Sequence, residues 1–387
     1  MGLSYDQVIS ASATAGSGTN LSAKRKRYLY GPVIDFLGLG GVSVVLFPIM
    51  LLLPQKEYSL TVGAIAVALT HVLNHPHFAF SYQIFYYGFR QKAFGSSYDA
   101  VLRARYIFAG IVVPIALLAF LLGCLIYGNA RILGYGANLM GFLVGWHYVK
   151  QGYGMLMVDA ALKRQYFGDT EKKILLVNSY AIWGLSWLTL NELASEKDLW
   201  GIQYYMFHIP PLVLAAVTVI VIVTSTLAGS VLIKKWRVNG GSLPAGGVVA
   251  YLVSLYLWQL LARWNLLWLL LVPALHSLQY LTVAARYRAN RFRGESGTHK
   301  TAATGRVILH GYQWQFIGFV AVGVALGYLG FWLAPSFLQV AMPYDRAIFG
   351  PTVFLFAFWV FINVHHYFLD NVMWRSQNPD VRKYLFA

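Results

Sequence analysis

The chain has 387 residues, of which 58% are hydrophobic and only 11% are charged. A soluble globular domain carries about 25% charged residues, so this composition argues against one and favours a polytopic helical membrane protein. The formal net charge of +16 would suggest nucleic-acid binding in a soluble chain. Basic residues also cluster in the short cytoplasmic loops of membrane proteins, so we expect the lipid bilayer, and no nucleic acid, as partner.

The N-terminal segment, residues 1–30, is polar, rich in small residues and carries the basic run KRKR at 24–27. It contains no apolar core. We therefore predict a disordered basic cytoplasmic tail rather than a signal peptide.

Apolar stretches long enough to cross about 30 Å of hydrocarbon recur along the rest of the chain. Their predicted bounds are 32–53, 59–85, 105–127, 133–160, 174–191, 207–229, 246–262, 265–284, 312–334 and 347–372. Residues 31–374 are therefore predicted to form an all-α polytopic integral membrane helical bundle of about ten transmembrane helices. Residues 375–387 are predicted to be a short cytoplasmic C-terminal tail.

The charges of the connecting segments alternate along the chain. The segments after the second, fourth, sixth and eighth spans are basic, and the longest of them covers residues 284–306. The opposite segments are poor in Lys and Arg, and the one after the fifth span is acidic, with Glu192, Glu196 and Asp198. Because cytoplasmic loops are enriched in Lys and Arg, both termini are predicted to be cytoplasmic. The expected location is a bacterial inner (plasma) membrane.

Seven of the ten histidines lie in spans that run from the outside inward. They are His71, His75 and His77 in the second span, His147 in the fourth, His276 in the eighth, and His365 and His366 in the tenth. At 1.5 Å per residue, their separations from the next basic residue place all four segments in one slab, from mid-membrane to the cytoplasmic half. Ionisable side chains are costly in lipid and usually carry function there, so we predict one buried His-rich site. The other three are expected to be ordinary polar residues: His208, His299 and His310.

The segment HVLNHPH, residues 71–77, contains three of these histidines. His71 and His75 are spaced i, i+4 and share one helix face, where they could hold one ion or make two separate interhelical hydrogen bonds. His77 points away from that face in a regular helix. Pro76 disrupts the preceding turn and could swing His77 back, or it could be an ordinary membrane-helix kink.

The segment GWHYVKQGYG, residues 145–154, places His147 and Gln151 on one stripe. By itself His147 could be only a hydrogen-bonding residue. Lys150 is costly inside a span, and it could serve as an ion-pair partner, as a proton donor or as a residue that snorkels to the interface. Tyr148 is a candidate catalytic residue, because its hydroxyl could donate a hydrogen bond or a proton.

The segment FINVHHYFLD, residues 361–370, contains two adjacent histidines that point about 100° apart in a helix. Asn363, His366 and Asp370 lie along one stripe. Asp370 could therefore be a metal ligand, or the acceptor that orients an imidazole. Alternatively, it could pair with Arg375 at the membrane interface.

The segment ALHSLQYL, residues 274–281, places Gln279 and Tyr280 one turn from His276, and Tyr280 is the second candidate catalytic residue. Neutral imidazole binds metals well, and a metal supplies the partner that hydrocarbon cannot. The predicted metal ligands are His71, His75, His77, His147, His276, His365, His366 and Asp370.

This donor set suits iron, copper or zinc, and not magnesium or calcium, which prefer oxygen. Only Cys124 is present, so an iron–sulfur cluster is excluded. Eight donors are too many for one tetrahedral zinc and suit two metals, with iron favoured and copper or zinc as alternatives. Two redox metals in a membrane indicate an oxidoreductase that uses O2 on a lipid-like substrate, by hydroxylation, desaturation or oxidative cleavage, with a redox donor at the cytoplasmic face.

Two of these segments resemble the histidine boxes of a known class. HVLNH at 71–75 is similar to the HxxxH box of integral-membrane fatty-acid desaturases and hydroxylases, and NVHHYFLD at 363–370 is similar to their late HxxHH box. Ile362 stands in place of the first histidine of that late box, and no middle HxxHH box is present. The resemblance implies a non-haem diiron oxygenase.

Two other functions are compatible with the same residues. Two histidines from facing helices could hold haem in an electron-transfer protein. The buried polar residues could also line the path of a proton or metal ion through a transporter, with Lys150, Asp159 and Asp370 as relay groups. A transporter would usually show two related halves, and the sequence shows none.

Overall fold

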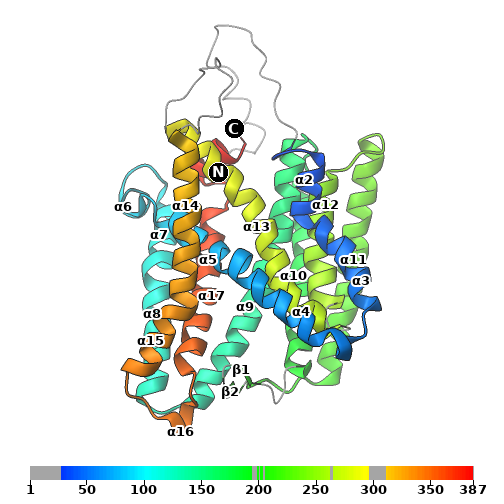
Figure 1. Cartoon of the computed structure of the whole chain (residues 1–387). Helices are drawn as coiled ribbons and strands as arrows, with labels where there is room; N and C mark the ends of the chain where they lie inside the picture. Colours follow the sequence, from blue (N-terminus) through cyan, green and yellow to red (C-terminus); the bar gives the residue numbers. More distant parts are fainter. Residues whose placement is uncertain are drawn as a thin grey trace.

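A computed structural model describes residues 28–193, 198–199, 201–203, 205–261, 265–295 and 311–386. The described chain is a bundle of helices with one small hairpin (Figure 1). Each of the ten predicted spans overlaps a helical segment. The predicted N-terminal tail, apart from residues 28–30, lies outside the described residues, as do His299 and His310.

The helices follow one another in chain order, with η marking a π-helical stretch. The first half contains α2 (Pro32–Phe36), η1 (Leu37–Gly41), α3 (Val42–Leu52), α4 (Gln55–Leu69), η2 (Thr70–Asn74), α5 (His75–Tyr86), α6 (Phe89–Phe94), α7 (Ala100–Ile107), η3 (Phe108–Val112), α8 (Val113–Ile126) and α9 (Ala130–Leu162). The second half contains α10 (Asp169–Leu193), α11 (Pro211–Val238), α12 (Ala245–Leu252), η4 (Val253–Leu260), α13 (Leu266–Glu295), α14 (Gly311–Tyr328), η6 (Leu329–Leu333), α15 (Ala334–Ala341), α16 (Arg346–Phe349), α17 (Val353–Met373) and α18 (Pro379–Leu385).

Six helical runs are long and apolar enough to cross a membrane. They are Pro32–Leu52, Ala100–Ile126, Pro211–Val238, Leu267–Glu295, Gln313–Ala341 and Val353–Met373. A shorter apolar run covers Ala245–Leu260. Long apolar helices are the form in which a chain satisfies its backbone in lipid, so this is the architecture of a membrane protein. Ten spans and cytoplasmic termini stay predictions.

Proline follows the π-helical stretch in three of the long runs. Pro76, Pro114 and Pro335 each stand at the start of the α-helix that comes after η2, η3 and η6. Proline has no N–H group to continue the i→i−4 ladder, and a π-helical turn accommodates the interruption without ending the helix. The α4–α5 run, which contains Pro76, crosses the other helices obliquely (Figure 1).

Two segments that the sequence predicts as a loop and a tail contain helix in the structure. The predicted loop at 284–306 begins inside α13, which continues to Glu295 because Arg291 pairs with Glu295 and with Asp380. The predicted C-terminal tail contains α18, which is packed through Val381 and Leu385. The described chain is all-α apart from one short hairpin, in which Asp198–Leu199 (β1) and Ile202–Gln203 (β2) pair antiparallel between α10 and α11.

The two ends of the described chain lie together. Leu29 and Leu385 belong to one hydrophobic cluster, which also contains Met155 of α9 and Val283 of α13. The β hairpin lies at the opposite end of the bundle (Figure 1). Helices α5, α9, α13 and α17 meet between these ends: α17 packs on α5 and α9, and α13 packs on α5.

Candidate metal centre

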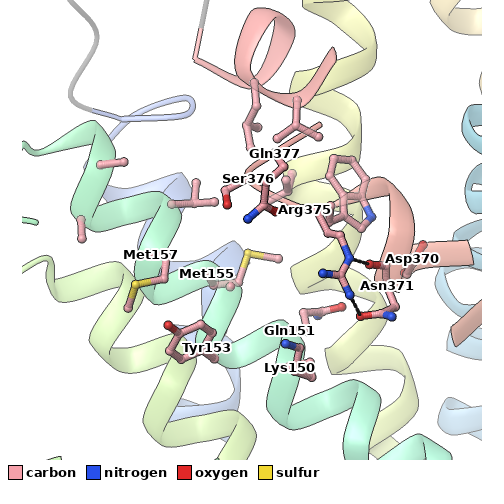
Figure 2. Close-up of a pocket in the computed structure, with 18 of the residues that line it drawn as sticks. Lys150, Gln151, Tyr153, Met155, Met157, Asp370, Asn371, Arg375, Ser376 and Gln377 are labelled. Atoms are coloured by element: carbon pink, nitrogen blue, oxygen red, sulfur yellow. Dashed lines mark hydrogen bonds between the residues drawn. The ribbon is translucent and has the colours of Figure 1, made fainter. Parts of the chain in front are cut away.

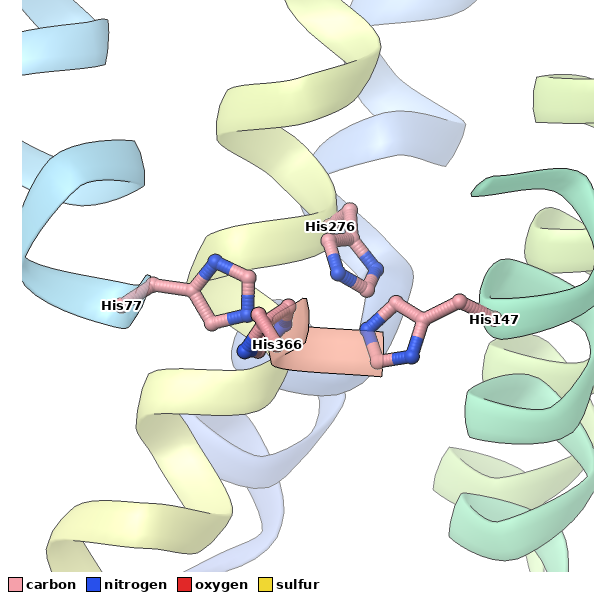
Figure 3. Close-up of side chains that lie close together, drawn as sticks. All are labelled: His77, His147, His276 and His366. Atoms are coloured by element: carbon pink, nitrogen blue, oxygen red, sulfur yellow. The ribbon is translucent and has the colours of Figure 1, made fainter. Parts of the chain in front are cut away.

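Four histidines from four helices converge inside the bundle (Figure 3). His77 of α5, His147 of α9, His276 of α13 and His366 of α17 each offer one ring nitrogen, and these atoms lie within 4.8 Å of one another. All four side chains are buried. We call this set the four-His cluster.

The four imidazole rings are arranged in a ring, in which each lies next to two others. The ring centroid of His77 lies 5.1 Å from that of His276 and 4.4 Å from that of His366. The centroid of His147 lies 4.9 Å from each of the same two rings. Each ring therefore touches two others, and the space between the rings is lined by imidazole from four sides.

Six of the eight ring nitrogens of this cluster have no hydrogen-bond partner. Nε2 of His77, Nε2 of His147, and both ring nitrogens of His276 and of His366 are buried without a hydrogen bond. A buried polar atom left unpaired costs about 1–3 kcal/mol, so the presence of several in one place needs an explanation. A metal ion at the centre would satisfy at least one nitrogen of each ring.

The separations suit a single ion. A metal–imidazole bond is about 2.0–2.1 Å long, so donors of one tetrahedral ion lie about 3.4 Å apart, and donors on opposite sides of one ion lie about 4.2 Å apart. The widest separation of 4.8 Å exceeds that by about 0.6 Å, which small ring rotations can close. Among the residues that the structure describes, no other group of three or more His, Cys, Asp or Glu donors meets this condition.

Hydrogen bonds orient His77 toward the centre. Its Nδ1 lies 3.1 Å from Oγ of Ser277, whose hydroxyl has Oδ1 of Asn74 and the carbonyl of Pro273 as acceptors at 2.8 Å each. With the Ser277 proton on either of those oxygens, the hydroxyl accepts from the Nδ1–H of His77. Nε2 of His77 is then the unprotonated nitrogen and is free to bind a metal.

Asp370 lies beside the cluster. Its Oδ2 is 3.4 Å from Nε2 of His366 and 3.8 Å from Nε2 of His147, and it accepts no hydrogen bond. Its Oδ1 accepts from Oγ of Ser81 at 2.9 Å. The carboxylate is thus close enough to orient an imidazole or, after a small rotation, to join the ligands. Arg375 does not pair with Asp370; it bonds Asn371 instead.

The two candidate catalytic tyrosines both border the four-His cluster. The ring of Tyr148 lies 4.2 Å from that of His276, centroid to centroid. The hydroxyl of Tyr280 lies 2.6 Å from Oγ of Ser81 and 3.4 Å from Oδ1 of Asp370. Tyr280 therefore has a hydroxyl in contact with the carboxylate at the site.

The structure places the other three predicted ligands outside the four-His cluster. Nδ1 of His71 bonds the carbonyl of Val67 at 2.8 Å, and the ring of His75 stacks on Phe331 at 4.3 Å. They lie on another face of the kinked α4–α5 run than His77.

Both ring nitrogens of His365, the third of these ligands, have protein partners. Nδ1 lies 2.9 Å from the hydroxyl of Tyr82, and Nε2 lies 3.0 Å from the carbonyl of Ala109. Neighbouring residues of a helix point about 100° apart, so turning His366 inward turns His365 toward α5 and η3.

Asp159, which the sequence suggests as a relay group, links two helices in the structure. It pairs with Lys163 at 2.7 Å and accepts from the backbone N–H of Gly247 at 2.8 Å, and so joins α9 to α12.

Sequence reasoning missed Ser81 and Ser277, which hold Asp370 and His77. A hydroxyl inside an apolar span carries only a weak signal, because membrane helices often contain serine bonded to its own backbone. Their positions, four residues after His77 and directly after His276, are the one hint the sequence offers.

A cavity of about 400 Å³ lies beside the four-His cluster, and His147 is one of its lining residues. Figure 2 shows residues that line this cavity. At its inner end it is lined by His147, Tyr280, Tyr367 and Asp370, and farther out by residues of α9, α17 and α18. Its volume falls in the range of about 300–1,000 Å³ that is typical of small-molecule pockets. The site therefore has both a buried donor set and a route by which a ligand can reach it.

Comparisons with protein-family models, with curated proteins and with solved structures find no match to this chain.

Proposed function

We propose that this chain is a membrane-bound oxidoreductase that holds one transition-metal ion on His77, His147, His276 and His366 and acts with O2 on a hydrophobic, lipid-like substrate. The observation that carries the proposal is the set of unpartnered, buried ring nitrogens that face a common centre. Apolar helices around it and the adjoining cavity support a substrate that arrives from the bilayer.

One ion is favoured over the two that eight donors would suggest. The four-His cluster supplies four close donors, whereas His71 and His75 offer a pair without a third, and His365 is bonded on both nitrogens. Asp370 would complete the set either as a fifth ligand or as the acceptor that fixes His366. It is also the nearest negative charge to balance a divalent ion.

An all-imidazole set suits iron, copper and zinc, and the geometry supports a catalytic role over a structural one. A structural zinc site is closed by four ligands, whereas a catalytic site keeps a position open. Here the cavity meets the cluster on the side of His147 and Asp370, where a substrate could reach the ion. For a reaction with O2 we favour iron, with copper as the redox-active alternative; zinc fits the same donors but has no redox chemistry of its own.

The residues around the cluster supply binding and proton transfer. When bound, a redox-active ion supplies the electron-transfer chemistry that O2 requires. The hydroxyl of Tyr280 is hydrogen-bonded to Ser81, lies beside Asp370 and faces the cavity, so it can donate a proton there. The rings of Tyr148 and Tyr367 pack against those of His276 and His147 and add aromatic surface beside the cluster. Electrons would come from a partner at the cytoplasmic face.

The same geometry disfavours haem. A haem iron takes two axial imidazoles, and the porphyrin occupies the plane between them. With all four donors within 4.8 Å, the two remaining histidines would stand where the macrocycle has to lie.

Elemental analysis and an absorption spectrum of the purified chain test the proposal. We expect about one equivalent of iron or copper per chain and no Soret band. A Soret band would assign the histidines to haem. Protein that contains no metal, and that binds none when iron, copper or zinc is supplied, would contradict the metal centre and favour a transporter or a structural polar core.

A further inference from the structure

The cavity beside the four-His cluster contains two cations near its inner end. Lys150 follows His147 by three residues in α9, and Arg375 follows Asp370 by five residues, just past the end of α17. Three residues of helix rise about 4.5 Å, so Lys150 stands about one turn from the cluster. Both cations line the same cavity (Figure 2).

Neither cation has a negative partner in the described part of the chain. The ion pairs there involve other basic residues. Lys150 lies over the ring of Tyr180 at 5.9 Å, and Arg375 donates from Nε to the backbone carbonyl of Asn371 at 2.9 Å. Partial burial, and then the nearby charge of Arg105, lower the pKa of Arg375.

The charged residues that line the whole cavity are mostly basic, like Lys150 and Arg375. Arg382 also lines it, as does Lys172, which pairs with Asp169 at 3.2 Å; Asp370 is the single acidic residue among its lining residues that the structure describes. Partly buried cations without counterions are costly, and Lys150 and Arg375 are two such cations. Because Asp370 already belongs to the metal site, the imbalance indicates that the ligand of the cavity carries negative charge.

Apart from Gln151, Asn371, Ser376 and Gln377, much of the rest of the lining is apolar. Met155, Met157 and Val158 of α9 face Leu385 and Phe386 of the C-terminal segment. A small inorganic anion would leave this surface without a partner. A ligand with one anionic end and an apolar chain matches both parts of the cavity.

We propose that the cavity binds an amphiphile with a compact anionic head group, a carboxylate or a phosphate, whose charge lies between Lys150 and Arg375. The apolar chain lies along the methionine wall of α9. This inference rests on the proposed function, because it makes such an amphiphile the substrate of the metal centre.

Competition binding to the full-length protein in a non-ionic detergent tests the proposal. The probe is radiolabelled hexadecyl phosphate, and the competitors are palmitate, hexadecanol and inorganic phosphate. We expect palmitate to compete, and hexadecanol and inorganic phosphate each to compete at least about ten-fold more weakly, since hydrogen bonds to charged groups and apolar burial both contribute. Hexadecanol equal to palmitate would overturn the anionic site, and inorganic phosphate equal to the probe would overturn the amphiphile.

Charge-removing variants locate the head group. Lys150→Gln and Arg375→Gln are each expected to weaken probe binding about ten-fold and to leave the metal content unchanged. Lys234→Gln and Arg237→Gln, on exposed positions of α11, are matched controls that should bind as the unchanged chain does. Unchanged affinity in both cavity variants would overturn the assignment.

The two proposals can fail separately. Charge-dependent binding in protein that takes up no metal would leave the head-group site standing and overturn the oxidoreductase. Full metal content without charge-dependent binding would overturn the head-group site and leave the metal centre in place.

Discussion

Replacement of His366 by Ala is expected to lower the affinity for metal by more than about 100-fold, because loss of a residue that merely orients a ligand already costs about 10–100-fold. His366 is fully buried at the centre of the cluster, and its ring contacts those of His77 and His147. The same loss is expected for Ala at His77, His147 and His276. Metal content after dialysis against a weak chelator measures it.

Matched controls come from histidines that lie outside the cluster. His71→Ala and His365→Ala are expected to keep the metal, because the ring of each is bonded to other protein groups. His366→Gln provides a second variant that fills more of the space, should the alanine variant fail to elute as folded protein. Full metal occupancy in all four cluster variants would rule the site out.

Replacement of Asp370 by Asn is expected to lower the affinity for metal by about 10–100-fold without abolishing binding. Oδ2 of Asp370 lies 3.4 Å from Nε2 of His366, and the amide keeps the size of the side chain while it removes the negative charge. The amide oxygen can still accept from Ser81, so the packing of α17 on α5 is preserved. Competition with a metal indicator dye gives the affinity.

The control for this substitution is Asp345→Asn. Asp345 caps the exposed N-terminus of α16 by accepting from the backbone N–H groups of Ala347 and Ile348. We expect no change in metal affinity there. An Asp370→Asn protein that binds metal as tightly as the unchanged chain would show that the carboxylate neither binds the ion nor orients His366.

Apolar length and charge placement predict the helices well and their ends poorly. A run of about twenty apolar residues has few alternatives to a helix in lipid, so each predicted span overlaps a helical segment. The end of α13 lies beyond its predicted boundary, where Arg288 and Arg291 suggest a loop. In the structure these side chains lie over Tyr87, and Arg291 also pairs with Asp380. Such pairs depend on segments far apart in sequence.

The sequence predicts that four segments bring histidines to one level of the bundle. It does not predict which side chain of each segment faces the centre. Counting residues to a basic anchor places four segments in one slab, and a histidine from each of the four does enter the cluster. Which histidine of a segment enters depends on the rotation of its helix. In the second span η2 and Pro76 set that rotation, so His77 rather than His75 faces the centre. In α17 the packing against α5 and α9 fixes the rotation of the helix, so that His366 rather than His365 faces the centre.

X-ray absorption at the K-edge of the bound metal tests most directly whether four imidazoles hold one ion. We expect four imidazole nitrogens at about 2.1 Å from the metal, with the outer-ring scattering that imidazole gives and at most one or two added oxygens. Fewer than three imidazoles, a sulfur ligand or a second metal at short range would contradict the single four-histidine centre.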